Sequence, residues 1–132
     1  MSALSTAAAT AAASTAPSTI AFIGGGNMAS AIIGGLIRQG MAPDQIEVIE
    51  PWQDARAALH NQYGITAQAL PGAQLARAGL VVWAVKPQTF KDAAAQVRPF
   101  TPSAVHLSVA AGIRSASLAQ WLGSERIVRA MP

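Results

Sequence analysis

Cysteine is missing from this sequence of 132 residues, and charged and aromatic residues are scarce. Without cysteine the chain can form neither a disulfide framework nor a thiolate metal site. Only 11% of the residues are charged and 5% are aromatic. No apolar run reaches the roughly 18 residues that a membrane-spanning helix needs. We therefore expect a cytoplasmic protein with no membrane contact, and no spacing of side chains indicates a metal site.

The small excess of positive charge does not indicate a nucleic-acid partner. The formal net charge is +3 and the pI is about 10.2. The nine basic residues are scattered from Arg38 to Arg129, whereas a nucleic-acid face needs clustered or aromatic-interleaved basic residues. We expect no nucleic acid to bind.

Residues 1–18 are a run of mainly alanine, serine and threonine without a charged side chain. A secretory signal has a basic start and a mitochondrial transit peptide is usually rich in arginine, so neither pattern fits well. We interpret this segment as a disordered tail, with a targeting remnant as the alternative. Residues 19–132 then form one domain.

Apolar runs alternate with segments of helical periodicity throughout residues 19–132. Strands are expected at 19–23, 46–49, 65–67, 80–85, 104–109 and 126–129. Helices are expected at 27–39, 52–62, 71–76, 89–97 and 115–122. Continuously apolar strands joined by helical crossovers indicate a parallel sheet that is covered on both faces. The fold class is therefore α/β, a Rossmann-type doubly wound sheet of about six strands.

The first expected strand runs into a glycine-rich turn, residues 24–29, with the pattern G-x-G-x-x-A. Gly24 would permit the tight turn, Gly26 would let a diphosphate approach the backbone, and Ala29 would let the helix pack closely. The unpaired amides of the helix N-terminus attract phosphate. An apolar strand before the turn and an amphipathic helix after it favour dinucleotide binding over a packing role alone.

Glu50 ends the second expected strand, 26 residues after Gly24. A carboxylate at this place can bind the adenosine ribose hydroxyls and repel a 2′-phosphate, which favours NAD over NADP. Two alternatives stay open: a merely solvated carboxylate before Pro51, or a 2′-phosphate bound by Arg56.

Later strand ends add candidates, because ligands of such sheets lie beyond the carboxyl ends of the strands. Lys86 follows an apolar strand and could approach the cofactor, or it could be an ordinary surface lysine. His60 is expected to face solvent, and His106 to have a buried or edge role. No nucleophile with a partnered base and no acid–base pair is evident, so no catalytic residue is predicted.

Four segments together resemble the pyrroline-5-carboxylate reductase family. They are FIGGGNMA at 22–29, AVKPQ at 84–88, SVAAGI at 108–113 and RAMP at 129–132. The resemblance covers residues 19–132 and implies reduction of 1-pyrroline-5-carboxylate to L-proline with NADH or NADPH, a step of proline biosynthesis. It implies cofactor contacts from Ile23, Gly24, Gly25, Gly26, Asn27, Met28, Ala29, Glu50, Ala84, Val85, Lys86, Pro87, Val109, Ala110 and Ala111. The Met131–Pro132 pair matches the start of a loop near the substrate.

The sequence departs from this family in two ways. Glu50 stands where members that favour NADP often carry a small polar residue. The C-terminal helical domain, which supplies the substrate site and the dimer interface in the family, is absent from these 132 residues. We therefore expect little or no reductase activity from this chain alone, exposed apolar surface, and a homo-oligomer only for the complete enzyme. The alternatives are a stand-alone NAD(P)-binding regulatory module and a dehydrogenase of the β-hydroxyacid or prephenate type.

Overall fold

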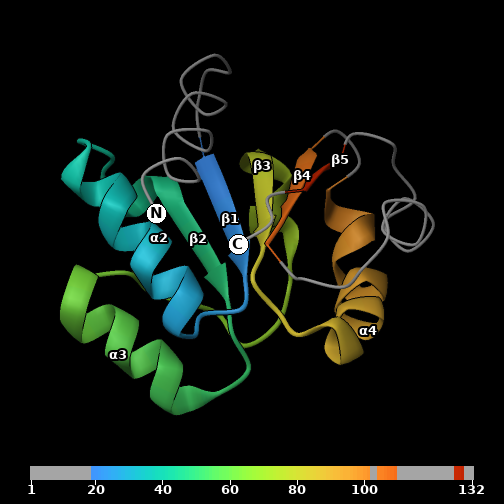
Figure 1. The fold of residues 1–132 in the computed structure, drawn as a ribbon, viewed down its shortest axis with the longest axis horizontal. Coiled ribbons are helices and arrows are strands. Elements are labelled where there is room, and N and C mark those ends of the chain that lie inside the picture. The colour runs from blue at the N-terminus through green and yellow to red at the C-terminus, as the bar shows by residue number, and fades with distance from the viewer. Residues whose placement is uncertain (1–18, 102–103, 110–126, 130–132) are drawn as a thin grey trace.

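The computed structural model describes residues 19–101, 104–109 and 127–129. Its centre is a five-stranded sheet in the order β2-β1-β3-β4-β5, and all neighbouring strands are parallel (Figure 1). The strands are β1 (Thr19–Ile23), β2 (Ile46–Ile49), β3 (Ala78–Trp83), β4 (Val105–Ser108) and β5 (Ile127–Arg129). The expected parallel α/β sheet is thus confirmed, with five strands in the described residues where about six were expected.

Within the described residues, three α-helices connect the strands. They are α2 (Asn27–Arg38), α3 (Gln53–Tyr63) and α4 (Pro87–Val97). Short 3-10 turns precede β2, precede β3 and follow α4; they are η1 (Pro43–Gln45), η2 (Ala73–Arg77) and η3 (Arg98–Phe100).

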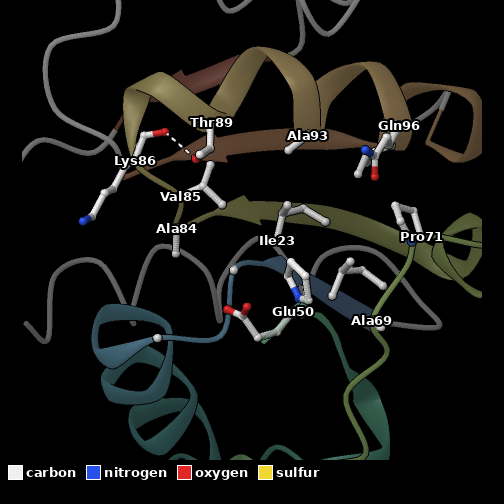
Figure 2. Close-up of a pocket in the computed structure, with 15 residues that line it drawn as sticks. Ile23, Glu50, Ala69, Pro71, Ala84, Val85, Lys86, Thr89, Ala93 and Gln96 are labelled. Atoms are coloured by element: carbon white, nitrogen blue, oxygen red, sulfur yellow. Dashed lines mark hydrogen bonds between the residues drawn. The ribbon is translucent and has the colours of Figure 1, made fainter. Parts of the chain in front are cut away.

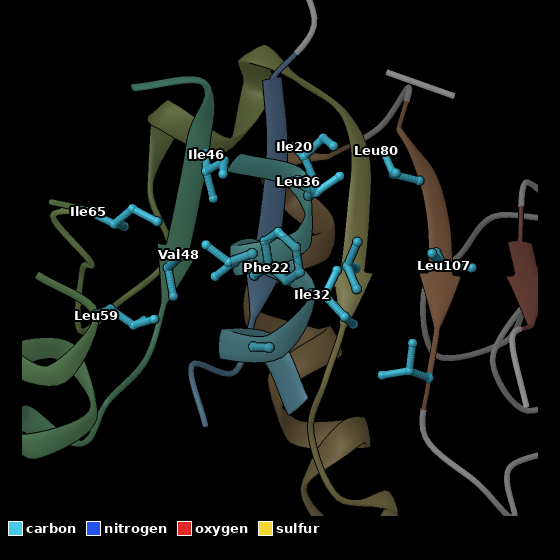
Figure 3. Close-up of a cluster of buried hydrophobic side chains, with 14 residues drawn as sticks. Ile20, Phe22, Ile32, Leu36, Ile46, Val48, Leu59, Ile65, Leu80 and Leu107 are labelled. Atoms are coloured by element: carbon cyan, nitrogen blue, oxygen red, sulfur yellow. The ribbon is translucent and has the colours of Figure 1, made fainter. Parts of the chain in front are cut away.

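The sheet is buried on both faces because side chains alternate along each strand. In β1, Ile20 and Phe22 belong to one core cluster, and Ala21 and Ile23 belong to the other. The first cluster is closed by the apolar sides of α2 and α3 (Figure 3). The second is closed by α4, which lies across the sheet from α2 and α3 in Figure 1. A strand that is buried at all five positions therefore has a helix layer on each side.

One expected strand is wrong. Residues 65–67 form no strand, and only the next residue, Gln68, makes a single parallel bridge with Ile49. The Gln68 N–H donates to Val48 O at 2.8 Å, and Gln68 O accepts from Glu50 N–H at 2.8 Å. Ile65 is buried in the core, but residues 65–67 make no backbone pairing with a strand of the sheet. An apolar side chain there reflects packing against the α3 side rather than strand pairing.

Two other boundaries move by about two residues. The strand expected at 80–85 is β3, two residues earlier, and the helix expected at 89–97 begins at Pro87. Proline is favoured in the first helical turn, because its fixed φ suits a helix and its missing N–H costs nothing there. The helix expected at 71–76 is the 3-10 turn η2. The tail 1–18 and the helix expected at 115–122 lie outside the described residues.

Candidate functional site

The glycine-rich turn bends the chain from β1 into α2. Gly24 has a φ of +98°, and a Cβ on it would lie 2.5 Å from the carbonyl oxygen of Ala84. The turn is fixed to both neighbouring strands: Gly24 N–H donates to Ile49 O, and Ala84 N–H donates to Ile23 O, each at 2.9 Å. Gly24 is therefore required by the fold itself, through both its backbone conformation and its close packing.

Gly26 differs, because nothing in the fold requires a glycine there. It precedes α2 with a φ of −82°, which any residue can adopt. A Cβ built on it would meet no atom of the chain within 4 Å. The space beside Gly26 is thus open, and a side chain would project into it at the start of the helix.

The N-terminus of α2 presents unpaired amides to this space. The first internal helix bond is Ser30 N–H to Gly26 O at 2.9 Å, and no side chain caps the helix. The amides of the first turn therefore have no partner within the helix. Together with the positive end of the helix dipole, they form a place suited to an anionic group.

Glu50 ties the glycine turn to the turn after β2. Its Oε1 accepts from Gly25 N–H at 2.8 Å, and its Oε2 accepts from Trp52 N–H at 2.9 Å. Both carboxylate oxygens are thus engaged by backbone amides. Charge-assisted hydrogen bonds of this kind are among the stronger ones in proteins.

A cleft of about 360 Å³ opens at the carboxyl ends of β1, β2 and β3, and we call it the main cleft (Figure 2). Its lining residues are Ile23, Gly24, Gly26, Ile49, Glu50, Pro51, Ala69, Pro71, Ala84, Val85, Lys86, Thr89, Ala93, Gln96 and Val97. Most of these side chains are apolar or small. The main cleft can therefore take a flat apolar group, with one carboxylate and one ammonium group at its edge.

The structure brings seven of the predicted site residues together in the main cleft. They are Ile23, Gly24, Gly26, Glu50, Ala84, Val85 and Lys86. Gly25 and Asn27 line a second hollow between the first turn of α2 and the length of α3, which also includes Trp52.

The remaining predicted residues lie elsewhere or cannot be placed. Met28 is exposed in the first turn of α2, while Ala29 is buried under that turn. Val109 is buried, and its N–H donates to Trp83 O at 3.1 Å. Pro87 begins α4, and Ala110 and Ala111 lie outside the described residues.

Sequence reasoning missed the far wall of the main cleft. Thr89, Ala93, Gln96 and Val97 line it from α4, and Ala69 and Pro71 line it from the segment before η2. The first three of these α4 residues are spaced by four and three positions, so they share one helix face. That spacing was visible in the sequence, but the direction of the face depends on how α4 packs on the sheet.

Two basic residues lie near the site, and the side chain of one of them, Arg56, is held by hydrogen bonds. Arg56 Nη1 donates to the carbonyl oxygens of Glu50 at 2.9 Å and Pro51 at 2.7 Å. Lys86 is exposed before α4, and its carbonyl accepts from the N–H and hydroxyl of Thr89. Arg56 thus supports the backbone at the end of β2.

The two histidines lie away from the main cleft. His60 is exposed on α3, as expected. His106 is buried in β4, where its Nδ1 accepts from Trp83 Nε1 at 2.9 Å. Among the described residues, no cluster of three His, Cys, Asp or Glu side chains could hold a metal ion, and no helix is long and apolar enough to cross a membrane.

Comparison with known proteins fits this geometry. Residues 19–112 match the family model described as NADP oxidoreductase, coenzyme F420-dependent. The chain belongs to this family. It is also homologous to the N-terminal, NAD(P)-binding domain of pyrroline-5-carboxylate reductases, so the resemblance seen in the sequence is confirmed.

Three relatives define the extent of the match. The chain is 42% identical to a pyrroline-5-carboxylate reductase of Pseudomonas aeruginosa over 115 residues, which cover 86% of this chain and 42% of the relative. A pyrroline-5-carboxylate reductase structure from Coxiella burnetii superposes with a TM-score of 0.77 at 34% identity, covering 86% and 43% of the two chains.

The Plasmodium falciparum reductase structure, which has NADP bound, gives a TM-score of 0.70 at 24% identity, with 86% and 42% coverage. Its likeness shows the Rossmann-like fold alone. In each comparison the chain spans well under half the length of its relative.

Proposed function

We propose that residues 19–132 are the cofactor-binding part of a pyrroline-5-carboxylate reductase, which reduces 1-pyrroline-5-carboxylate to L-proline with NAD(P)H. The observation that carries this proposal is the open space beside Gly26. A glycine that the fold does not need stands where unpaired helix amides face an open space. A diphosphate would use both features, because its oxygens need close approach to the backbone and donors to bind.

The proposed roles of the chain's residues follow from their places. The amides at the start of α2 would hold the diphosphate, and the apolar wall of the main cleft would cover the adenosine end of the cofactor. A bound nicotinamide cofactor would supply the hydride. The proposed contacts are those predicted from the sequence, extended by Pro51, Ala69, Pro71, Thr89, Ala93 and Gln96.

The substrate site is proposed to lie mainly outside these 132 residues. Hydride transfer to an imine needs a group that orients the substrate and a source of a proton. Among the described residues that line the main cleft, Glu50 and Lys86 are the ionisable ones, and Glu50 is engaged with the backbone. We therefore expect the chain alone to have little or no reductase activity, and the homo-oligomer to form through the rest of the enzyme.

Two assays on the 132-residue chain test the proposal. Calorimetric titration with NADH and with NADPH should show saturable binding of at least one of them near one per chain. A proline-formation assay with the same protein should show little turnover. If neither dinucleotide binds, the proposed cofactor role is wrong. Robust turnover would contradict the proposal that the substrate site lies mainly outside these 132 residues.

A further inference from the structure

We propose that His106 is a positioning residue for the cofactor, because it holds the indole of Trp83 against which α4, one wall of the main cleft, is packed. The inference rests on the proposed function, since it concerns how tightly the main cleft binds its dinucleotide. Neither His106 nor Trp83 lines the main cleft. Both would therefore act on the cofactor through α4 and not by contact with it.

The main cleft is continuous with the second core cluster, which α4 closes. Ile23, Ile49 and Val97 are buried members of this cluster, and all three also line the main cleft. Val85 and Ala93 pack against the cluster and line the cleft as well. Figure 2 shows Ala93 on the α4 side of the cleft and Ile23 on the sheet side. The packing of the cluster therefore sets where the α4 wall stands relative to the sheet.

Trp83 is the largest fully buried side chain among the described residues. Its indole stacks on the ring of Phe90 in α4, with the ring centroids 4.5 Å apart and an angle of 28° between the planes. Phe90 is fully buried too. Trp83 directly precedes Ala84 and Phe90 directly follows Thr89, and both of these neighbours line the main cleft. The stack thus joins two sides of the cleft from within the core.

The indole of Trp83 is held from the side of β4. Its Nε1–H donates to His106 Nδ1 at 2.9 Å, and the two ring centroids are 6.0 Å apart. The exposed fraction is 0% for Trp83 and 1% for His106, so water does not reach the pair to replace the acceptor. A buried N–H without an acceptor is unfavourable. Without His106 the indole would therefore turn toward another acceptor, and its stack on Phe90 would change.

A change in this stack reaches the cleft because protein interiors are close-packed and pass small displacements on to their neighbours. Ala93 and Val97 follow Phe90 by three and seven positions in α4, so they lie on the same side of the helix. A shift of Phe90 would therefore move the apolar wall that faces the bound cofactor. We expect loss of the acceptor to weaken dinucleotide binding by about three- to tenfold, the effect of one typical hydrogen bond.

The test measures the dissociation constant for NADH or NADPH, whichever the native chain binds more tightly, in two variants at position 106. His106→Leu removes the acceptor and keeps an apolar side chain in the core, so affinity should fall by about three- to tenfold. His106→Asn places an acceptor oxygen as many bonds from the backbone as Nδ1, so affinity should stay close to the native value. The ¹⁵N NMR resonance of the Trp83 indole N–H should be displaced in the leucine variant and native-like in the asparagine variant.

Leu107→Ala is the matched control for a loss of stability alone. Leu107 is the next residue of β4 and is buried in the first core cluster, on the opposite face of the sheet. Truncating it should destabilise the fold, yet leave affinity unchanged at temperatures where thermal unfolding shows the variant to be folded. If His106→Leu does not fold, Phe90→Leu takes its place: it removes the stack, keeps the bond between Trp83 and His106, and should also weaken binding.

The outcomes separate this inference from the proposed function. Unchanged affinity in the folded His106→Leu or Phe90→Leu variant would overturn the inference and leave the proposed function intact. Equal weakening in Leu107→Ala, or an asparagine variant that binds as weakly as the leucine variant, would overturn it as well. A native chain that binds neither NADH nor NADPH would overturn the proposed function, and the inference with it.

Discussion

At the scale of single residues, the two conspicuous glycines of the turn have different reasons to be glycine. Gly24 has a positive φ and touches the backbone of Ala84, whereas Gly26 has an ordinary φ and touches nothing. The first is constrained by folding and the second, in our account, by binding. Substitutions at these positions should therefore separate stability from cofactor affinity.

Gly24→Ala should destabilise the chain. The added methyl group would lie 2.5 Å from Ala84 O, and the residue would keep an unfavourable φ. Such strain costs about 1–3 kcal/mol, so the midpoint of thermal or urea unfolding should fall. Gly40→Ala is the control, because Gly40 has a similar positive φ but no atom close to an added Cβ. Gly40→Ala should therefore lose less stability than Gly24→Ala, and the difference between the two losses measures the clash with Ala84.

Gly26→Thr should leave stability nearly unchanged and weaken dinucleotide binding. Threonine is favoured before the first turn of a helix, and there is room for it in the free protein. Its side chain would fill the space proposed for the diphosphate, so we expect affinity for NADH to fall by roughly tenfold or more, as for loss of charge-assisted hydrogen bonds. Calorimetry measures the affinity, and unchanged affinity in a folded variant would argue against the site.

At the scale of elements, α2 and α3 are fitted to one another at Gly34. The Tyr63 hydroxyl donates to Ser30 O at 3.1 Å, and a Cβ on Gly34 would lie 2.7 Å from the Tyr63 hydroxyl oxygen. The glycine thus makes room for the end of the tyrosine. This contact sets how closely the two helices approach.

Gly34→Ala should lower the free energy of unfolding by about 1–3 kcal/mol through overpacking. Tyr63→Phe removes the atom with which the new methyl group collides. The double variant should therefore be more stable than the sum of the two single effects implies. Strict additivity in urea unfolding would show that the two side chains do not interact.

His106 joins β4 to β3 through the indole of Trp83. Because the indole N–H can only donate, His106 Nδ1 must be the acceptor, which requires a histidine without a proton on Nδ1. His106→Phe would leave the buried indole N–H without this acceptor, so we expect a loss of about 1–3 kcal/mol in unfolding free energy. His60→Phe on the exposed face of α3 is the control and should change stability little.

At the scale of the whole molecule, the sequence predicts the layers well because burial on both faces makes a strand apolar at successive positions. β1 and β3 are such strands, and both were predicted within two residues. Ile65 is equally buried, but its segment pairs with the sheet only through Gln68. A buried apolar residue alone therefore did not distinguish a strand from a loop that packs on the core.

The parts of the site whose residues are close together in the sequence could be predicted from the sequence. The glycine turn and Glu50 follow from spacing, but Ala69, Pro71 and the α4 wall reach the main cleft only through the packing of η2 and α4 on the sheet. The pairing of Glu50 with the amides of Gly25 and Trp52 likewise depends on a contact across 25 residues. Such contacts have no signature in a single sequence.

Large apolar side chains also remain exposed beyond the carboxyl ends of the strands. Met28, Trp52 and Leu70 are 46%, 66% and 70% exposed. They follow the glycine turn, β2 and the Gln68 bridge, and none of the three lines the main cleft. The apolar surface and association expected from the sequence stay a prediction, which sedimentation of the chain with and without NADH can check.

The central claim is that the amides at the start of α2 hold a diphosphate. The most direct measurement is a two-dimensional NMR titration of the ¹⁵N-labelled chain with ADP-ribose, which carries the diphosphate and the adenosine but no nicotinamide. We expect the largest saturable shifts at the amides of Gly26, Asn27, Met28 and Ala29, with little change at the distant turn around Gly64. Undisturbed amides at residues 26–29, or larger shifts in another part of the chain, would contradict it.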